Sequence, residues 1–124
     1  MGAIGAKVAD MGVMLGMDVI GYDPAISVEA AWKLPNMVSR RDNLESVFAE
    51  SDYLTLHIPA IEETKNLVSK DLLSNSKQGL KLINFARDEI VDSKAVIDAL
   101  DSGKLGGYVT DFADLGLIER AKLK

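Results

Sequence analysis

The chain has 124 residues, of which 48% are hydrophobic and 27% are charged, and it carries a formal net charge of −5 at pH 7. This length suits one globular domain, and the acidic balance argues against a nucleic-acid-binding surface. With no cysteine and a single histidine, the sequence excludes disulfides and thiolate or multi-histidine metal sites, so we predict no metal. No uncharged segment approaches the ~20 apolar residues of a membrane span, and we expect a cytoplasmic protein with neither membrane nor nucleic-acid partners.

The first predicted element is a helix that begins at a glycine pair. Apolar residues recur at helical spacing through Gly2–Leu15, and Gly16 suits the position after the helix end. Gly2 and Gly5 match the last two glycines of a G-x-G-x-x-G dinucleotide-binding loop, without the first glycine and the strand before it. Glycine turns open many helices, so the half-motif is weak evidence alone, although the positive helix end favours a phosphate. The apolar stripe consists of Ile4, Val8, Met11 and Leu15.

Strand-like and helix-like segments alternate along the rest of the chain. Asp42 with Glu45 resembles a capping box, Asp92 or Ser93 can cap a later helix, and Gly103 can end it. Because no hairpin signal joins the strands, the order predicts βαβ units around a parallel sheet. The expected strands are Met17–Tyr22, Met37–Ser39, Tyr53–His57, Lys81–Phe85 and Gly107–Asp111, and the expected helices are Ser27–Lys33, Asp42–Ala49, Ser69–Ser74 and Asp92–Ser102.

Asp23 is the first candidate binding residue, because ligands of parallel sheets bind at the carboxyl ends of the strands. It follows a predicted strand and lies 18 residues after Gly5, near the ~20-residue offset at which an acid accepts the adenosine ribose hydroxyls. A carboxylate there would repel a 2′-phosphate and so favour NAD over NADP. The alternative is that Asp23–Pro24 is only a turn. The glycine pair at the preceding helix favours the ribose interpretation.

His57 ends one predicted strand, and Arg87 lies two residues after the end of another. A lone histidine is more often structural than functional, but its position at a strand end keeps a cofactor contact open. At this position the Arg87 guanidinium could hold a substrate carboxylate in a bidentate grip, whereas most arginines are solvated surface residues. The residue types alone leave both alternatives open.

Several segments together resemble the NAD-binding domain of the D-2-hydroxyacid dehydrogenases, most closely that of the D-3-phosphoglycerate dehydrogenases. The resemblance extends to about Phe112 and leaves residues 113–124 unassigned. It implies one partial NAD-binding domain over residues 1–124, with a Rossmann-like three-layer α/β fold and a mostly parallel sheet that lacks its first central strand. The matching segments are Gly2–Gly5, Leu15–Pro24, Ser51–Pro59, Glu63–Lys65, Asn84–Arg87 and Gly107–Phe112.

The resemblance assigns roles around an NAD cofactor. Gly2 to Ile4 would meet the pyrophosphate, Asp23 the adenosine ribose, and His57 to Pro59 the adenine side. Thr64 would add a hydroxyl near the phosphates, and Asp111 would take the nicotinamide carboxamide. The cofactor-binding residues implied in this way are Gly2, Ala3, Ile4, Tyr22, Asp23, Pro24, His57, Ile58, Pro59, Thr64, Phe85, Ala86 and Asp111.

The implied reaction moves a hydride between NAD and C2 of a small 2-hydroxyacid or 2-ketoacid, in serine biosynthesis if the phosphoglycerate dehydrogenase likeness holds. Arg87 would be the catalytic residue, holding the substrate carboxylate and polarising the C2 oxygen. The family's acid–base histidine is not matched, and Gly116 stands where its supporting glutamate is expected. Asp88 replaces a family glycine, so we expect strain there if the turn needs a positive φ.

The absence of the first strand and of the substrate domain suggests a second interpretation. In the family, that strand lies between Met17–Tyr22 and Tyr53–His57, so its loss would leave two unpaired strand edges. We expect the gap to close by direct pairing of these strands or by a homodimer that exchanges strands. The alternative to a dehydrogenase is then an inert α/β fragment that self-associates and binds NAD weakly. A methyltransferase-like binder would leave Asn84–Arg87 and Asp111 unexplained.

Overall fold

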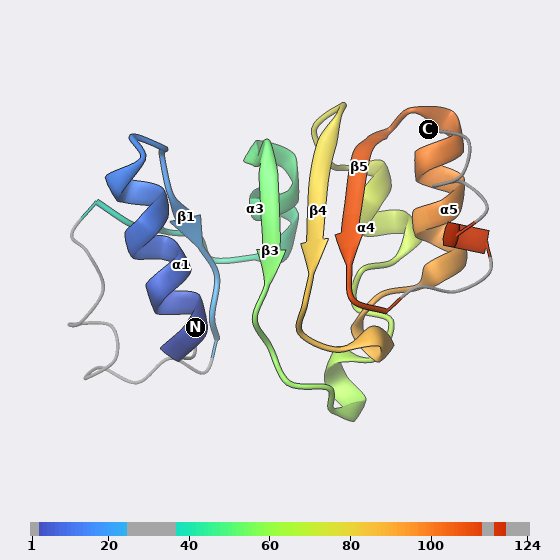
Figure 1. Cartoon of the computed structure of the whole chain (residues 1–124), viewed down its shortest axis with the longest axis horizontal. Helices are drawn as coiled ribbons and strands as arrows, with labels where there is room; N and C mark the ends of the chain where they lie inside the picture. Colours follow the sequence, from blue (N-terminus) through green and yellow to red (C-terminus); the bar gives the residue numbers. More distant parts are fainter. Residues whose placement is uncertain (1–2, 25–36, 113–115, 119–124) are drawn as a thin grey trace.

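The computed structural model describes residues 3–24, 37–112 and 116–118 (Figure 1). The helix expected at Ser27–Lys33 and most of the unassigned tail lie outside these residues. None of the helices in the described ranges has the length and apolar character needed to cross a membrane. In chain order the elements are α1 (Ala3–Met14), β1 (Ile20–Gly21), β2 (Ser39–Arg40), α3 (Leu44–Glu50), β3 (Tyr53–Leu56), η1 (Glu62–Thr64), α4 (Lys70–Ser74), β4 (Leu80–Asn84), η2 (Asp88–Ile90), α5 (Ser93–Ser102) and β5 (Leu105–Thr110).

All strand pairs of the described chain are parallel, which confirms the predicted α/β class with parallel strands. β1 pairs with β2, and β3, β4 and β5 form a separate sheet in that order. Figure 1 shows β1 beside β3 with both arrows pointing the same way, but no ladder joins them. The expected direct pairing of these two strands is therefore wrong for the described residues, and each keeps one open edge facing the other sheet.

The hydrophobic core lies on one face of the β3–β4–β5 sheet. Leu54, Leu56, Leu80 and Leu82 alternate along β3 and β4 with exposed or half-buried residues, as a sheet with one covered face requires. Helices α3, α4 and α5 cover that face (Figure 1). Their most deeply buried side chains are Val47, Phe48, Leu72, Leu73, Ala95 and Val96.

Helix α1 confirms the predicted helix, and Gly16 ends it with a φ of +82°. Its apolar stripe, however, is exposed, from 39% at Val8 to 74% at Leu15. The buried side of the helix carries small residues instead, Gly5 and Ala9, and a Cβ on Gly12 would lie 2.9 Å from Val19 Cγ2. Small residues allow a helix to approach the neighbouring chain closely, so α1 contacts the segment leading into β1 with this side.

The helix boundaries follow the expected caps, with one correction. Asn43, not Asp42, caps α3, because its Oδ1 accepts the Ser46 N–H at 2.8 Å. The capping box predicted at Asp42 is therefore wrong by one residue. Asp92 caps α5 as expected, and Gly103 ends it in the left-handed conformation at φ +81°.

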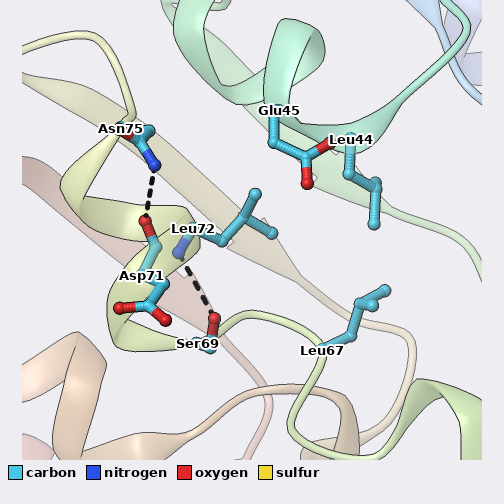
Figure 2. Close-up of a pocket in the computed structure, with 7 residues that line it drawn as sticks. All are labelled: Leu44, Glu45, Leu67, Ser69, Asp71, Leu72 and Asn75. Carbon is cyan, nitrogen blue, oxygen red and sulfur yellow. Dashed lines mark hydrogen bonds between the residues drawn. The ribbon is translucent and has the colours of Figure 1, made fainter.

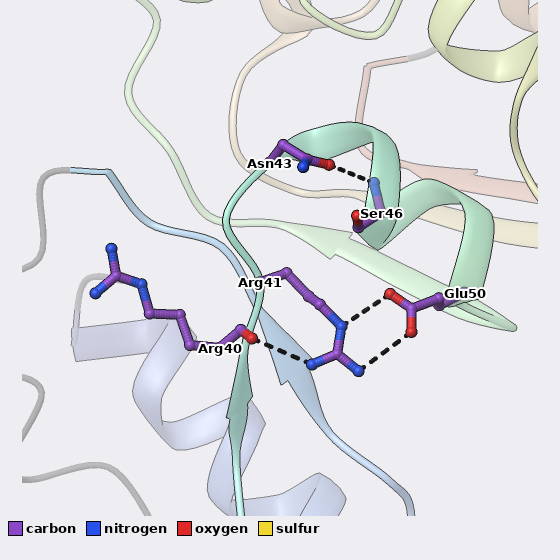
Figure 3. A network of polar contacts seen from close by, with 5 residues as sticks. All are labelled: Arg40, Arg41, Asn43, Ser46 and Glu50. Atoms are coloured by element: carbon purple, nitrogen blue, oxygen red, sulfur yellow. Dashed lines mark hydrogen bonds and ion pairs between the residues drawn. The ribbon is translucent and has the colours of Figure 1, made fainter.

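The β1–β2 sheet is tied to α3 by one arginine (Figure 3). Arg41, directly after β2, donates from Nε to Glu50 Oε2 at 2.8 Å and from Nη2 to Oε1 at 3.2 Å. Its Nη1 donates to the Arg40 carbonyl at 3.1 Å. The hydrogen bond from Arg41 lowers the pKa of Glu50 and raises that of Arg41. This bidentate contact links the end of β2 to α3, the helix that precedes β3 in the chain.

Candidate functional site

The predicted site residues follow strands that end at one edge of the molecule. In Figure 1 the arrowheads of β1, β3, β4 and β5 point to the same edge, and the N-terminal end of α1 lies there too. Segments that follow these strands therefore converge on that edge, as a parallel arrangement requires. The residues concerned are Asp23 after β1, His57 after β3, Arg87 after β4 and Asp111 after β5.

The adenosine end of the predicted site lies after β1. Tyr22 is half-buried and packs against the core, Asp23 is half-buried, and Pro24 is exposed. Of the glycine-loop residues, Gly2 lies outside the described residues, Ala3 begins α1, and the Ile4 side chain is 69% exposed. The structure thus places a carboxylate at a strand end and a helix N-terminus at the same edge.

His57 is held by a neighbour on the same side of β3. Its Nε2 lies 2.9 Å from Thr55 Oγ1, at hydrogen-bonding distance. Burial lowers the pKa of His57, which favours the neutral ring. Ile58 packs against the core and Pro59 is exposed. The segment after β3 therefore presents a mostly apolar, neutral surface, of the kind that suits a base better than a phosphate.

Thr64 is engaged within its own loop. Its hydroxyl donates to the Pro59 carbonyl at 2.7 Å and accepts the Ile61 N–H at 2.9 Å. It lies in η1, a short turn that sequence patterns did not indicate. The hydroxyl thus stabilises the bend that follows the His57–Pro59 segment, and its predicted phosphate contact stays a prediction.

The loop after β4 is organised by a residue to which the sequence assigned no separate function. Asn84 is completely buried, and its Oδ1 accepts the Ala86 N–H at 3.1 Å. Its Nδ2 donates to the Arg87 carbonyl at 2.9 Å and lies 3.5 Å from the Tyr108 hydroxyl oxygen. Ala86 packs against the core, whereas the Phe85 side chain is 52% exposed. An asparagine at the end of a strand whose alternate residues are leucines was the available signal.

Arg87 is exposed at the tip of this loop, and its Nη1 donates to the Ala86 carbonyl at 2.6 Å. Asp88 begins η2 and has no positive φ, since Asn66 is the one non-glycine residue of the described chain with that conformation. The condition for strain at Asp88, a positive φ, is therefore not met, because the chain enters a 3-10 turn that any residue can adopt. The loop remains open to solvent around the guanidinium.

Asp111 lies beside this loop because β4 and β5 are neighbours. Asn84 pairs with Thr110, so Asp111 follows β5 at the level where the Arg87 loop follows β4. The Phe112 N–H donates to Thr110 Oγ1 at 3.0 Å, which shapes the turn around Asp111. The Asp111 side chain is exposed. The structure thus brings a carboxylate and a guanidinium loop to adjacent strand ends.

A surface hollow of about 190 Å³ lies elsewhere, between α3 and α4 (Figure 2). It contains none of the residues predicted to bind a cofactor or substrate. Its polar groups are already used in part, since Ser69 caps α4 through the Leu72 N–H and Asn75 donates to the Asp71 carbonyl. The lining residues are Leu44, Glu45, Leu67, Ser69, Asp71, Leu72 and Asn75.

The helix start, the carboxylate after β1 and the loops after β3 to β5 lie at one edge, where parallel α/β folds bind dinucleotides. A family model described as "D-isomer specific 2-hydroxyacid dehydrogenase, NAD binding domain" matches residues 1–120. The chain belongs to this family and represents its NAD-binding domain, which confirms the resemblance and the cofactor NAD.

The chain is similar to several curated enzymes. It is 35% identical over 111 residues to D-3-phosphoglycerate dehydrogenase of Synechocystis, covering 90% of this chain and 20% of that protein. It is 36% identical over 110 residues to D-lactate dehydrogenase of Lactiplantibacillus plantarum, covering 89% of this chain and 32% of that protein. The chain therefore spans a fifth to a third of the length of these relatives.

Solved structures share the fold. The chain superposes on Salmonella D-lactate dehydrogenase with a TM-score of 0.86 at 27% identity, covering 99% of this chain and 41% of that one. The D-lactate dehydrogenase of Aquifex aeolicus, solved with NAD and lactic acid, gives a TM-score of 0.80 at 32% identity, with coverage of 98% and 36%. These likenesses confirm the Rossmann-like arrangement of the elements.

Proposed function

We propose that this chain acts as the cofactor-binding part of an NAD-dependent dehydrogenase for a small 2-hydroxyacid or 2-ketoacid. The observation that carries the proposal is the arrangement of Arg87 and Asp111 on adjacent strand ends, at the edge where Asp23 follows β1. NAD supplies hydride chemistry when it is bound. The protein residues bind and orient the reacting groups.

Each predicted residue has a chemical function in this proposal. The half-buried Asp23 carboxylate accepts hydrogen bonds from the adenosine ribose hydroxyls, and the neutral segment that begins at His57 lies against adenine. Asp111 accepts the amide N–H of the nicotinamide. Gly2 to Ile4 and Thr64 serve the phosphates. Tyr22 and Pro24 complete the ribose contact, and Phe85 and Ala86 form the surface beside nicotinamide.

Arg87 is the residue that binds the substrate in this proposal. Its guanidinium is exposed and carries donors in a planar fork, which matches a carboxylate in a bidentate geometry. The same fork polarises the oxygen at C2. The sole histidine, His57, is engaged with Thr55 and is assigned to the adenine side, so we expect this chain alone not to turn substrate over.

For an enzyme that contains this NAD-binding domain, the proposed substrate is 3-phosphohydroxypyruvate, in cytoplasmic serine biosynthesis. The relatives named D-3-phosphoglycerate dehydrogenase support it, and the relatives named D-lactate dehydrogenase, at nearly the same identity, favour pyruvate as the second candidate. Turnover followed at 340 nm with each ketoacid tests the choice in any longer protein that contains this sequence. A preference for pyruvate would refute the first substrate.

We also propose that the chain forms a homodimer, with exchanged strands as one form. The support is the open edge of β1, the open edge of β3 and the exposed stripe of α1. Sedimentation equilibrium over a range of protein concentrations measures the association. A monomer at all concentrations refutes the dimer and favours two independent sheets.

Calorimetric titration with NAD tests cofactor binding by this chain. Asp23→Ala removes the proposed ribose acceptor and is expected to weaken NAD binding about tenfold, as the loss of one good hydrogen-bonding site does. Asp71→Ala, on α4 in the separate hollow, is the matched control and leaves the affinity unchanged. If wild-type protein shows no NAD binding, the inert-fragment alternative is supported instead.

A further inference from the structure

Asn84 is a polar side chain that is completely buried at the end of β4. It lies among the most deeply buried side chains of the protein, together with Leu80 and Leu82 on the same strand. A buried amide must have all its hydrogen-bonding atoms satisfied. Asn84 meets this requirement through the loop that follows it, because Oδ1 accepts from Ala86 and Nδ2 donates to the Arg87 carbonyl.

These two bonds hold the backbone on both sides of the Arg87 α-carbon. The N–H of Ala86 and the C=O of Arg87 turn back toward one amide, so the loop closes around Asn84. The Tyr108 hydroxyl lies 3.5 Å from Nδ2, so the same amide also contacts β5. The next backbone bond, from the Val91 N–H to the Asp88 carbonyl at 3.2 Å, already belongs to η2. Asn84 therefore fixes where the Arg87 side chain leaves the backbone.

We propose that Asn84 is a positioning residue, which aims the Arg87 guanidinium at the carboxylate of a 2-hydroxyacid or 2-ketoacid. This inference rests on the proposed function of Arg87. An apolar side chain of similar size would fill the same space but leave the Ala86 N–H and the Arg87 C=O unpaired. The Asn84 amide is therefore needed for the hydrogen bonds of the loop, whereas filling the buried space would require only a side chain of this volume.

The first test needs no ligand and measures amide hydrogen exchange by NMR. Asn84→Ala removes both loop bonds, so the Ala86 amide is expected to exchange at least about tenfold faster relative to the Val96 amide in the core. Asn84→Asp keeps an acceptor for Ala86 but replaces the amide donor, so Ala86 stays more protected than in the alanine variant. Leu82→Ala is the matched control, because it opens the core on the same strand and keeps the Asn84 side chain; it is expected to speed the Val96 amide and not to raise the ratio of Ala86 to Val96 exchange.

The second test measures the function of the loop. With the protein saturated by NAD, oxamate serves as an unreactive carboxylate probe whose binding is followed by shifts of the Arg87 amide signal. Asn84→Ala is expected to weaken oxamate about tenfold while NAD affinity stays within about twofold. Arg87→Ala abolishes oxamate binding. A purely structural asparagine would instead change NAD and oxamate affinity in step with overall stability, as Leu82→Ala does.

The outcomes separate the two proposals. An unchanged exchange ratio in both Asn84 variants overturns the inference, as does oxamate affinity in Asn84→Ala that equals that of Leu82→Ala. If Asn84→Ala does not fold, Asn84→Asp and Tyr108→Phe decide, and normal oxamate binding in both overturns the positioning function. If wild-type protein binds NAD but no oxamate, the substrate function of Arg87 fails, and the exchange ratio alone decides whether Asn84 organises the loop.

Discussion

Gly106, near the start of β5, offers the sharpest test of the packing that supports the candidate site. A Cβ on this residue would lie 2.5 Å from the carbonyl oxygen of Gly79, and 3.1 Å and 3.3 Å from its carbonyl carbon and Cα. All three atoms belong to the backbone, so no side chain can rotate away. Gly79 itself is held at φ +85° and donates to the Lys104 carbonyl at 2.9 Å. Gly106→Ala must therefore displace either the backbone of β5 or the backbone segment around Gly79.

The expected loss of stability follows from two opposing effects. Overpacking a tight contact costs about 1–3 kcal/mol. Replacing glycine by alanine restricts the unfolded chain and returns about 0.4–1 kcal/mol where the native backbone accepts the change. We therefore expect Gly106→Ala to lower the free energy of unfolding by about 1–2 kcal/mol, a large part of the total for a domain of this size.

The adjacent Gly107 provides the matched control. A Cβ there would meet the Lys81 Cγ at 3.9 Å, an ordinary contact with a flexible side chain. Gly107→Ala should therefore leave the free energy of unfolding unchanged within about 0.5 kcal/mol, or raise it slightly. Urea titration followed by circular dichroism measures both variants under identical conditions. Equal stability of the two variants would refute the reasoning, because the short distance to Gly79 would then have no energetic consequence.

Three further predictions concern a helix end and two titrating groups. Gly103→Ala should cost about 1 kcal/mol in urea titration, because φ +81° disfavours a Cβ, and an unchanged midpoint would contradict this. Arg41 lowers the pKa of Glu50, so their pair stabilises the fold above the ordinary carboxyl pKa near 4.3 and this contribution is lost as pH falls through the lowered value. Glu50→Gln should therefore be less stable than wild type at pH 7 and approach it at pH 3, whereas a constant difference would exclude the ion pair as its cause. Burial lowers the pKa of His57, so its neutral form stabilises the fold above about pH 6.5, and this contribution declines as the pH falls below that value. In paired urea titrations at pH 7 and pH 5, the free energy of unfolding should therefore fall less for His57→Gln than for wild type. Equal losses in the two proteins would argue against the burial effect.

The local sequence predicted most elements because caps and periodicity are local properties. Ser69 and Gly103 lie where the expected helix boundaries place them, since one side-chain cap or one positive φ decides each. Asp42 and Asn43 are both good caps, so only the geometry of the Ser46 N–H distinguishes them. The exposed stripe of α1 could not be foreseen, because a period of 3.6 indicates a helix without identifying its neighbours.

The site divides in the same way between local and distant causes. Arg87 and Asp111 were found because residues after parallel strands share an edge, which requires only the order of the elements. Asn84 was missed as a separate determinant, since its partners at Ala86, Arg87 and Tyr108 become visible only when the loop closes over the strand end. Gly12 was missed because its constraint comes from Val19 in the next element.

The candidate-site residues lie on two separate sheets, so their spacing depends on how these sheets are held together. The proposed ribose acceptor Asp23 follows β1, whereas Arg87 and Asp111 follow strands of the other sheet, and no ladder joins the two in the described chain. Their relative position therefore depends on the short segment from β2 to α3 and on side-chain contacts, among them the hydrogen bonds from Arg41 to Glu50 and the packing of Tyr22 against the core. A cofactor that contacts both sheets would add a further connection between them, so its binding would stabilise their relative position by mass action.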